Sequence, residues 1–438
     1  MKIAKTHKSS TISSPFLFIR RSQSVGGWAR TCLEKIGELT SRYQPSIYNL
    51  FVTLTLLFTA TQCQTQPLPQ ITGKVALTEG WKPTLYLIQP RRFADIAASF
   101  SGLVIDSASI APDGSFAFSR LPQNEEKTLL EICIQKTGSR FANQLVDNNP
   151  LLANYMPLVL QKGESVDIFA EAARFQATFS IKNPSAENLA LLQLRTIRHA
   201  AYTQQDLSDQ AEDHSDESKL LEHEDALYQF QRPLMAFADS TVYWWPALVA
   251  ARWVSPSGDY ERVPEFMVDQ CQKWRGRMAA NPWVEQFCQT ASREKLPLLI
   301  GDTMPDYALP MLSGDTTLVH SLLGSRITIL DIWASWCAPC RRENREILVP
   351  LWAKYQGHGL QILGYSIDSD AAAWKAAIAK DGATWPHASH LSGDATPFLE
   401  VLRITTIPAN FILNAQGKVI AKNLHGEALR AFVAGYLK

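Results

Sequence analysis

The sequence has no excess of either charge, because 42 basic and 42 acidic side chains leave a formal net charge of +0. A neutral chain lacks the broad positive field that gathers nucleic acid, so we expect no nucleic-acid partner. No internal repeat of about 20 to 50 residues is present, which excludes solenoids and propellers. At 438 residues, with 46% hydrophobic and 19% charged positions, the chain has room for about two or three globular domains.

Cysteine is also scarce. The chain has seven, at positions 32, 63, 133, 271, 288, 337 and 340, which is too few for a disulfide scaffold of this size. Cys133 stands alone in an apolar run and is predicted to be a small core residue. Cys271 and Cys288 flank a predicted turn at Asn281-Pro282, and an oxidising compartment could join them. Two unrelated buried thiols are the alternative, and both stay open because sequence does not give the distance between the sulfurs.

Long apolar runs are missing as well. Residues 50–60 form an apolar run of 11, which suits the apolar part of a signal peptide better than a membrane-spanning helix of about 20 residues. A buried core segment is the alternative. Cys63 follows and resembles the lipid-modified cysteine of bacterial lipoproteins, although Gln62 replaces the usual small residue. Ordinary cleavage or an uncleaved anchor therefore stays open, and we expect a membrane-anchored protein on the periplasmic side.

Four regions are predicted along the chain, namely a leader at 1–63, a β-rich domain at 64–182, a helical region at 183–298 and a redox domain at 299–438. Short alternating runs predict strands of a small antiparallel β domain at 71–75, 84–88, 104–110, 115–119, 129–135 and 165–170. The turn at 111–114 predicts a hairpin. Helical periodicity and five tryptophans that we assign to the core mark the helical region, and the polar run at 204–219 is predicted to face solvent.

The last region alternates strand and helix. We predict strands at 327–333, 360–368, 409–414 and 418–421, with helices at 339–355, 370–380 and 427–437. This β-α-β start followed by β-β-α is the order of elements in a thioredoxin fold.

The close pair Cys337 and Cys340 falls where a buried strand ends and a helix begins. The first thiol then meets the unsatisfied N–H groups and the positive end of the helix dipole, which favour the nucleophilic thiolate. The second cysteine, one turn further, is placed to resolve a mixed disulfide. Half of a zinc site is the alternative, but no second Cys or His pair lies at metal spacing nearby. We predict no metal and no cofactor.

Residues 330–340 (LDIWASWCAPC) resemble the active-site strand and loop of thioredoxins, and Thr406-Ile407-Pro408 resembles their cis-proline loop. With residues 301–306 (GDTMPD) and 414–419 (NAQGKV), the pattern is most similar to exported oxidoreductases of the TlpA and ResA kind. The resemblance covers about residues 300 to 438. The preceding regions look like the N-terminal extensions of such proteins in Bacteroidota.

The resemblance implies roles for several residues. Pro408 should be cis and face the disulfide, and Ile407 should present its backbone to an incoming polypeptide, with Trp336 as a further substrate contact. Asp331 matches the buried aspartate that takes the proton of the resolving thiol, and burial should raise its pKa. An ordinary trans turn proline and a strand-end aspartate bonded to the backbone are the alternatives. The chain departs from the family at Arg345, where a helix-kinking proline is usual.

The residues between the cysteines suggest the direction of electron flow. Oxidants of this fold carry His between the two cysteines and have potentials of about −120 mV, compared with about −270 mV for thioredoxin. Ala338-Pro339 contains no His, so we expect a reductase of exported protein disulfides, with apocytochromes c as candidates, which needs a membrane electron donor. A peroxiredoxin is the enzymatic alternative, but the Pro-x-x-x-Thr-x-x-Cys pattern is not matched. A surface binding or assembly lipoprotein with a secondary redox domain is the other.

Overall fold

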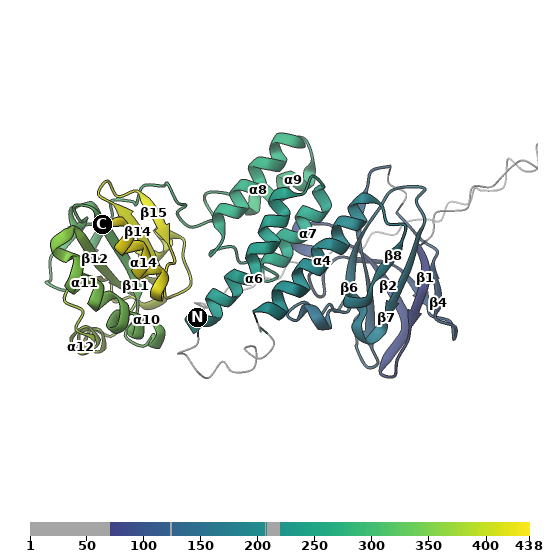
Figure 1. The fold of residues 1–438 in the computed structure, drawn as a ribbon, viewed down its shortest axis with the longest axis horizontal. Helices are drawn as coiled ribbons and strands as arrows, with labels where there is room; N and C mark the ends of the chain where they lie inside the picture. The colour runs from purple at the N-terminus through teal and green to yellow at the C-terminus, as the bar shows by residue number, and fades with distance from the viewer. Residues whose placement is uncertain (1–70, 123–124, 206, 208–219) are drawn as a thin grey trace, which may run out of the picture. The chain divides into compact units, whose positions relative to one another are not determined.

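The computed structural model describes residues 71–438, apart from residues 123–124, 206 and 208–219 (Figure 1). The apolar run at 50–60 and Cys63 lie outside the described residues, as does most of the polar run at 204–219. Within the described ranges, no helix is both long enough and apolar enough to cross a membrane.

The β-rich region contains two four-stranded sheets, with the orders β4-β1-β7-β8 and β3-β2-β5-β6. The strands are β1 (Ile71–Ala76), β2 (Trp81–Gln89), β3 (Leu103–Ser109), β4 (Ser115–Phe118), β5 (Thr128–Lys136), β6 (Tyr155–Leu160), β7 (Val166–Glu171) and β8 (Ser180–Lys182). Neighbouring strands pair antiparallel except β1 and β7, which are parallel. The predicted antiparallel architecture is confirmed, with this one parallel pair.

The turn at 111–114 forms, but the hairpin predicted from it does not. The Gly114 N–H donates to the Ala111 carbonyl at 2.8 Å, and the Ala111 N–H donates to the Ser115 carbonyl at 2.9 Å. The flanking strands β3 and β4 nevertheless belong to different sheets. A turn motif reverses the chain locally, whereas the partner of each strand depends on which apolar face it has to bury.

Strand β6 was not predicted, because it is an apolar run with Pro157 within it, and all six of its residues are buried. Its edge is covered by a helix. Asn188 on α4 (Ala186–Gln204) accepts from the Val159 N–H and donates to the Val159 carbonyl, each at 2.8 Å. One amide side chain thus satisfies both backbone groups of an edge residue.

The helical region packs on the β-rich region in a single hydrophobic core. Its other long helices are α6 (Leu220–Ser240), α7 (Trp244–Val254), α8 (Pro264–Arg277) and α9 (Pro282–Thr290). Helix α7 is buried along its whole length. One cluster of buried residues runs from Ile71 to Leu296 and includes Trp244, Trp245, Trp253 and Trp274, so these tryptophans are core residues as predicted. The predicted boundary at residue 183 therefore separates two kinds of secondary structure that share one core.

The C-terminal region is built on a five-stranded sheet of order β13-β12-β11-β14-β15. A separate hairpin comprises β9 (Ala308–Pro310) and β10 (Thr316–Leu318), and the sheet comprises β11 (Ile327–Trp333), β12 (Leu360–Ser366), β13 (His387–Ser389), β14 (Ala409–Asn414) and β15 (Val419–Lys422). The helices are α10 (Ala338–Glu343), α11 (Val349–Tyr355), α12 (Ala371–Asp381), α13 (Pro397–Leu402) and α14 (Gly426–Tyr436). β11 pairs parallel with β12 and antiparallel with β14, which lies beside it in Figure 1. The predicted thioredoxin fold is confirmed.

All seven residues of the central strand β11 are buried, because apolar clusters cover both faces of the sheet. Ile327 and Ile329 belong to the cluster that includes Leu348 of the active-site helix and Leu429 of α14. Leu330 and Ile332 belong to the opposite cluster. Since side chains alternate along a strand, Asp331 shares the face of Ile327 and Ile329.

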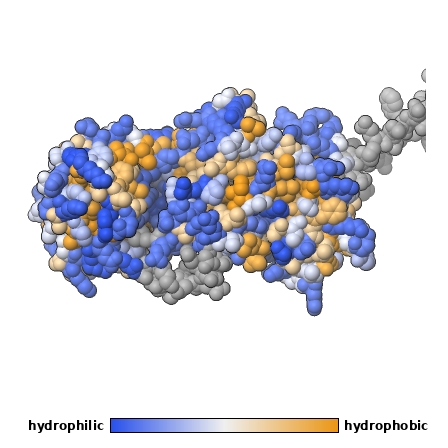
Figure 2. All heavy atoms as spheres, viewed as in Figure 1, coloured by the Kyte–Doolittle hydropathy of each residue, from blue (hydrophilic) through white to orange (hydrophobic). Residues whose placement is uncertain are grey.

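Exposed apolar side chains are scattered over the described residues. On the face drawn in Figure 2, hydrophilic residues cover most of the described surface and hydrophobic residues lie among them in small groups. The most exposed large apolar side chains are spread along the chain, at Val242 (66%), Leu152 (61%) and Phe100 (58%). Exposed apolar residues scattered in this way are ordinary.

Candidate active site

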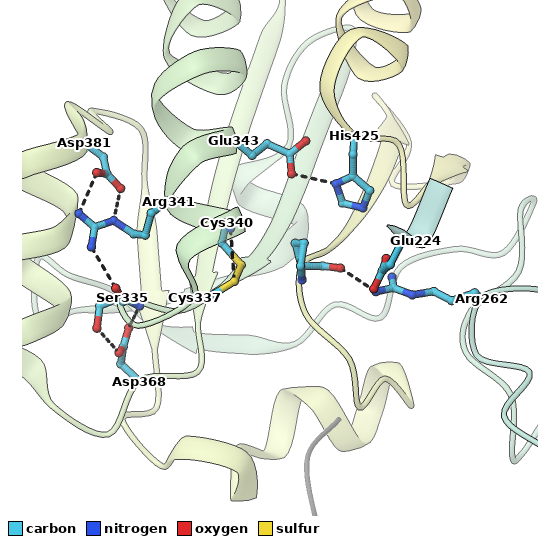
Figure 3. The surroundings of a disulfide bond; sticks show 11 residues. Glu224, Arg262, Ser335, Cys337, Cys340, Arg341, Glu343, Asp368, Asp381 and His425 are labelled. Atoms are coloured by element: carbon cyan, nitrogen blue, oxygen red, sulfur yellow. Dashed lines mark hydrogen bonds and ion pairs between the residues drawn. A yellow bond between two sulfur atoms is a disulfide. The ribbon is translucent and has the colours of Figure 1, made fainter. Parts of the chain in front are cut away.

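The two close cysteines lie at the junction of β11 and α10 (Figure 3). They form a disulfide with their Cα atoms 5.3 Å apart. Cys337 is the N-cap residue of α10, and its Sγ accepts a hydrogen bond from the Cys340 N–H at 3.3 Å. Pro339 stands in the first turn, where no intrahelical donor is needed. The free N–H groups of this helix end would stabilise negative charge on the Cys337 sulfur once the disulfide is reduced.

Access to the disulfide is limited. Cys337 is 5% exposed and Cys340 is 2% exposed, whereas Trp336 beside them is 43% exposed. The large exposed ring of Trp336 gives the surface next to Cys337 an apolar contact for another molecule. Its role as a substrate contact stays a prediction.

Asp331 lies in β11 and is 4% exposed. Burial, reinforced by the nearby negative charge of Glu343, raises the pKa of Asp331 well above its ordinary value. The rise in pKa expected from its place in the strand is confirmed. A carboxyl group with a raised pKa keeps its proton to higher pH than an ordinary aspartate and is a stronger base once ionised, which suits the proton transfer predicted for it.

Glu343 is a site residue that the sequence analysis missed. It lies one turn after Cys340 on α10, is 3% exposed, and pairs through Oε2 with His425 Nδ1 at 2.8 Å (Figure 3). Its Oε1 accepts from the Gly426 N–H at 3.1 Å. The available signal was position, because residues three apart on a helix share a face. The partner comes from 82 residues further along the chain, which no local pattern shows.

Ser335, two residues before Cys337, is held by hydrogen bonds to its backbone and side chain. Asp368 accepts from the Ser335 N–H at 2.9 Å and from Ser335 Oγ at 2.6 Å. Ser366 Oγ also donates to Asp368, at 2.6 Å. Asp368 is 1% exposed. This aspartate therefore fixes the start of the loop that carries the reactive cysteine.

Arg341 completes that support and does not act as a free cation near the thiol. Its Nη1 donates to the Ser335 carbonyl at 3.0 Å, and its guanidinium pairs with Asp381, with Nη2 2.8 Å from Oδ1 (Figure 3). Burial alone would raise the pKa of Asp381, but the hydrogen bonds from Arg341 and Arg345 hold it below its ordinary value. Arg341 is therefore held in place, because a carboxylate from α12 and a loop carbonyl both bind it.

The helix after the cysteines is interrupted without the usual proline. A π-helical turn at Asn344–Leu348 separates α10 from α11, and Pro350 stands in the first turn of α11. Arg345 lies within this turn and binds Asp381 Oδ1 at 3.0 Å. The π turn therefore interrupts the helix at Arg345, the position where the family usually has a helix-kinking proline.

The peptide bond between Ile407 and Pro408 is cis, as the resemblance implied. Ile407 belongs to the same apolar cluster as both redox cysteines. It is only 2% exposed, and Pro408 is also buried. The loop therefore has the predicted conformation, while the backbone of Ile407 is closed to solvent in this structure.

The remaining cysteines lie apart from this site or outside the described residues. Cys271 and Cys288 form a disulfide, which decides between the two alternatives left open by the sequence. Cys133 is a free buried thiol, and burial raises its pKa to about 12, so it is an inert core residue. In the described part of the chain, no group of three or more His, Cys, Asp or Glu side chains could hold a metal ion.

The fold and the site together define a class of protein. A five-stranded mixed sheet, a disulfide at the end of its central strand and a cis-proline loop make residues 299–438 a thioredoxin-like domain with a dithiol–disulfide centre. Residues 300–422 match the AhpC/TSA family.

Relatives with named activities agree with this class. Thiol-disulfide oxidoreductase ResA of Bacillus cereus (strain ZK / E33L) is 26% identical over 148 residues, which are 34% of this chain and 81% of the relative. Thiol:disulfide interchange protein DsbE of Pseudomonas fluorescens biotype C is 33% identical over 75 residues, 17% of this chain and 39% of the relative. The solved thiol-disulfide oxidoreductase from Bacteroides fragilis NCTC 9343 is 30% identical, covers 31% of this chain and 98% of its own, and has a TM-score of 0.28. The chain therefore contains a thiol-disulfide oxidoreductase domain, which is homologous to ResA over 34% of the chain and to DsbE over 17%.

Proposed function

We propose that the protein is an exported, membrane-tethered reductase of disulfides in extracytoplasmic proteins, with Cys337 as the attacking sulfur and Cys340 as the resolving one. One observation carries the proposal, namely the Cys337–Cys340 disulfide at a helix N-terminus. The buried acid Asp331 and the cis peptide before Pro408 add to it.

The reaction begins with the reduced site. The Cys337 thiolate attacks one sulfur of a client disulfide, forming a mixed disulfide and releasing the first client thiolate, which takes up a proton. Cys340 then loses its proton to ionised Asp331 and attacks the Cys337 sulfur. This step closes the Cys337–Cys340 disulfide and releases the second client thiol. The client gains two electrons and two protons, and an external dithiol has to return them to the enzyme.

Export and tethering are supported by residues outside this site. The apolar run at 50–60 suits the apolar part of a signal peptide, and Cys63 after it resembles the lipid-modified cysteine of bacterial lipoproteins. The Cys271–Cys288 disulfide is typical of an oxidising compartment. In such a compartment a reductase needs a membrane donor for its electrons. The absence of His between Cys337 and Cys340 favours reduction over oxidation, with apocytochromes c as candidate clients.

Insulin reduction by the full chain, with dithiothreitol as the electron source, tests the activity. Cys337→Ser should abolish turnover, and Cys340→Ser should trap a mixed disulfide that mass spectrometry detects. The matched control is Cys271→Ser with Cys288→Ser, which should retain turnover. Equal activity in all variants would contradict the proposal, and efficient turnover of hydrogen peroxide would indicate a peroxiredoxin.

Two further measurements test the direction and the location. A reduction potential of about −120 mV for the Cys337/Cys340 pair would indicate an oxidant and would reverse the proposed direction of electron flow. Labelled palmitate should be incorporated into the wild-type chain in the host and not into Cys63→Ser. Equal labelling of both would remove the lipid anchor from the proposal.

A further inference from the structure

The loop between α7 and α8, residues 255–263, binds the backbone of the cis-proline loop through Glu261. Glu261 Oε2 accepts from the Thr405 N–H at 2.8 Å and from Thr405 Oγ1 at 2.7 Å. Glu261 Oε1 accepts from the Thr406 N–H at 3.1 Å. One carboxylate thus occupies two consecutive backbone donors just before Ile407.

The next residue binds the other side of Ile407. Arg262 Nη2 donates to the Pro408 carbonyl at 2.9 Å and pairs with Glu224 of α6 at 3.0 Å (Figure 3). Glu261 and Arg262 therefore bind polar groups of residues 405, 406 and 408. Both lie in the extension, by which we mean the β-rich and helical regions before the redox domain.

These contacts accompany a closed loop. Ile407 is 2% exposed and Cys337 is 5% exposed. Burial raises the pKa of Glu261, and the hydrogen bonds from Thr405 oppose that rise, as is usual for a carboxylate removed from water and bound by donors. A client polypeptide that pairs with the Ile407 backbone has to approach a loop in which Glu261 and Arg262 already bind the backbone on both sides of Ile407.

We propose that Glu261 and Arg262 form an intramolecular clamp, which occupies the cis-proline loop and which a client polypeptide displaces before its disulfide reaches Cys337. The inference rests on the proposed reductase function and assigns a regulatory role to the extension. Because the clamp consists of hydrogen bonds to groups that a polypeptide can bind in the same way, exchange of one ligand for the other is feasible. Glu224 remains a partner for Arg262 when the loop is released.

A second contact at the same boundary provides a matched control. Glu265, at the start of α8, accepts from the Ile300 N–H at 3.0 Å and pairs with Lys422 at 2.8 Å. It joins the same two regions but makes no contact with residues 405–408 in the described hydrogen bonds and ion pairs. A variant at Glu265 therefore weakens the boundary without opening the clamp directly.

The test compares the full-length wild type with Glu261→Ala, Arg262→Ala and Glu265→Ala. Reduction of insulin and of the small disulfide 5,5′-dithiobis(2-nitrobenzoate) is measured for each. Release of the clamp should lower KM for insulin about fivefold, because apparent affinity scales with the fraction of open sites. The small disulfide does not need the loop, so its rate should stay within about twofold. Glu265→Ala should behave like the wild type with both.

Hydrogen exchange gives a readout that does not depend on activity. The amides of Thr405 and Thr406 should be protected in the wild type and in Glu265→Ala, and should exchange faster in Glu261→Ala. An unchanged or higher KM for insulin in folded Glu261→Ala and Arg262→Ala overturns the clamp, as does unchanged protection of both amides. A wild type that reduces neither substrate contradicts the proposed function instead, and the exchange measurement still decides whether the clamp exists.

Discussion

The described residues contain two disulfides that are almost equally buried but lie in very different surroundings. Cys271 and Cys288 are 8% and 5% exposed, and Cys337 and Cys340 are 5% and 2% exposed. The Cα separations are 5.1 Å and 5.3 Å. Burial and spacing therefore do not distinguish the bond between two helices from the bond that we propose exchanges with clients.

What distinguishes them is where each sulfur lies on its helix. Cys271 is inside α8, and Cys288 is in the last turns of α9, where N–H groups are already bonded and the helix dipole disfavours an anion. Cys337 instead caps the N-terminus of α10, and the strand before it, β11, contains the buried acid Asp331. Under the proposed function, local donors and a proton acceptor, more than burial, set the reactive disulfide apart.

The strongest test of the comparison removes the helical disulfide. Cys271→Ser combined with Cys288→Ser should lower the free energy of unfolding by about 3 kcal/mol, the loss for a closed loop of this size. Insulin reduction at a temperature where the variant is folded should stay within about twofold. Urea denaturation and the reductase assay check the two parts, and a folded variant without activity would show that the helical pair takes part in electron transfer.

Asp331→Asn should slow the resolving step about 100-fold, the usual contribution of a general base. In the wild type this step should accelerate with pH as Asp331 ionises through its raised pKa, whereas the variant should lack this limb of the profile. Rapid-mixing measurements of mixed-disulfide decay between acid and alkaline pH check both effects. An unchanged profile would remove Asp331 from the mechanism.

The pH dependence of folding stability provides a second test of the raised pKa of Asp331. Because the folded pKa of Asp331 lies above the unfolded one, the folded protein loses relative stability as pH rises from the ordinary aspartate range through the raised pKa. The Asn variant does not ionise, so its melting temperature relative to wild type should increase over that interval. A constant difference across pH would contradict the raised pKa.

Glu131, in the β-rich region, is a buried acid that can be compared with Asp331 and is not part of the redox site. It is 1% exposed in β5, and burial raises its pKa to about 8. By the same linkage, Glu131→Gln should gain stability relative to wild type as pH rises from 4.5 to about 8, by about 4 kcal/mol at the upper end. Reductase activity should not change. Denaturation curves at several pH values, paired with the insulin assay, separate it from Asp331→Asn.

The smallest effect is expected at Asp368, which supports the active-site loop. Asp368→Asn places an amide donor against the donors Ser335 and Ser366, so kcat/KM should fall about fivefold as the loop loses its fixed geometry. Asp370→Asn is the control, because Asp370 caps α12 and an asparagine caps equally well. Equal losses in both variants would indicate a general effect on the domain.

Regular elements with a clear period were predictable from sequence. β11 and β14 have the predicted bounds, because each is an apolar run ended by turn or cap residues. β8, β13 and α13 were missed because they are short, and β6, an apolar run like β11, was missed because Pro157 lies within it. Pairing was less predictable still, as shown by β3 and β4, which follow each other along the chain and enter different sheets.

For the site, the sequence by itself determined the residues that act through their neighbours in the chain. The placement of Cys337 and Cys340 at a strand end follows from local order, because a helix end is a local property, whereas the roles of Asp331 and the cis-proline at 408 came from the resemblance to thioredoxins. Only the tertiary structure decided that Glu343 meets His425, that Asp368 holds Ser335 and that Glu261 reaches Thr405. Those contacts join positions 33 to 144 residues apart, and such proximity depends on the packing of the whole fold.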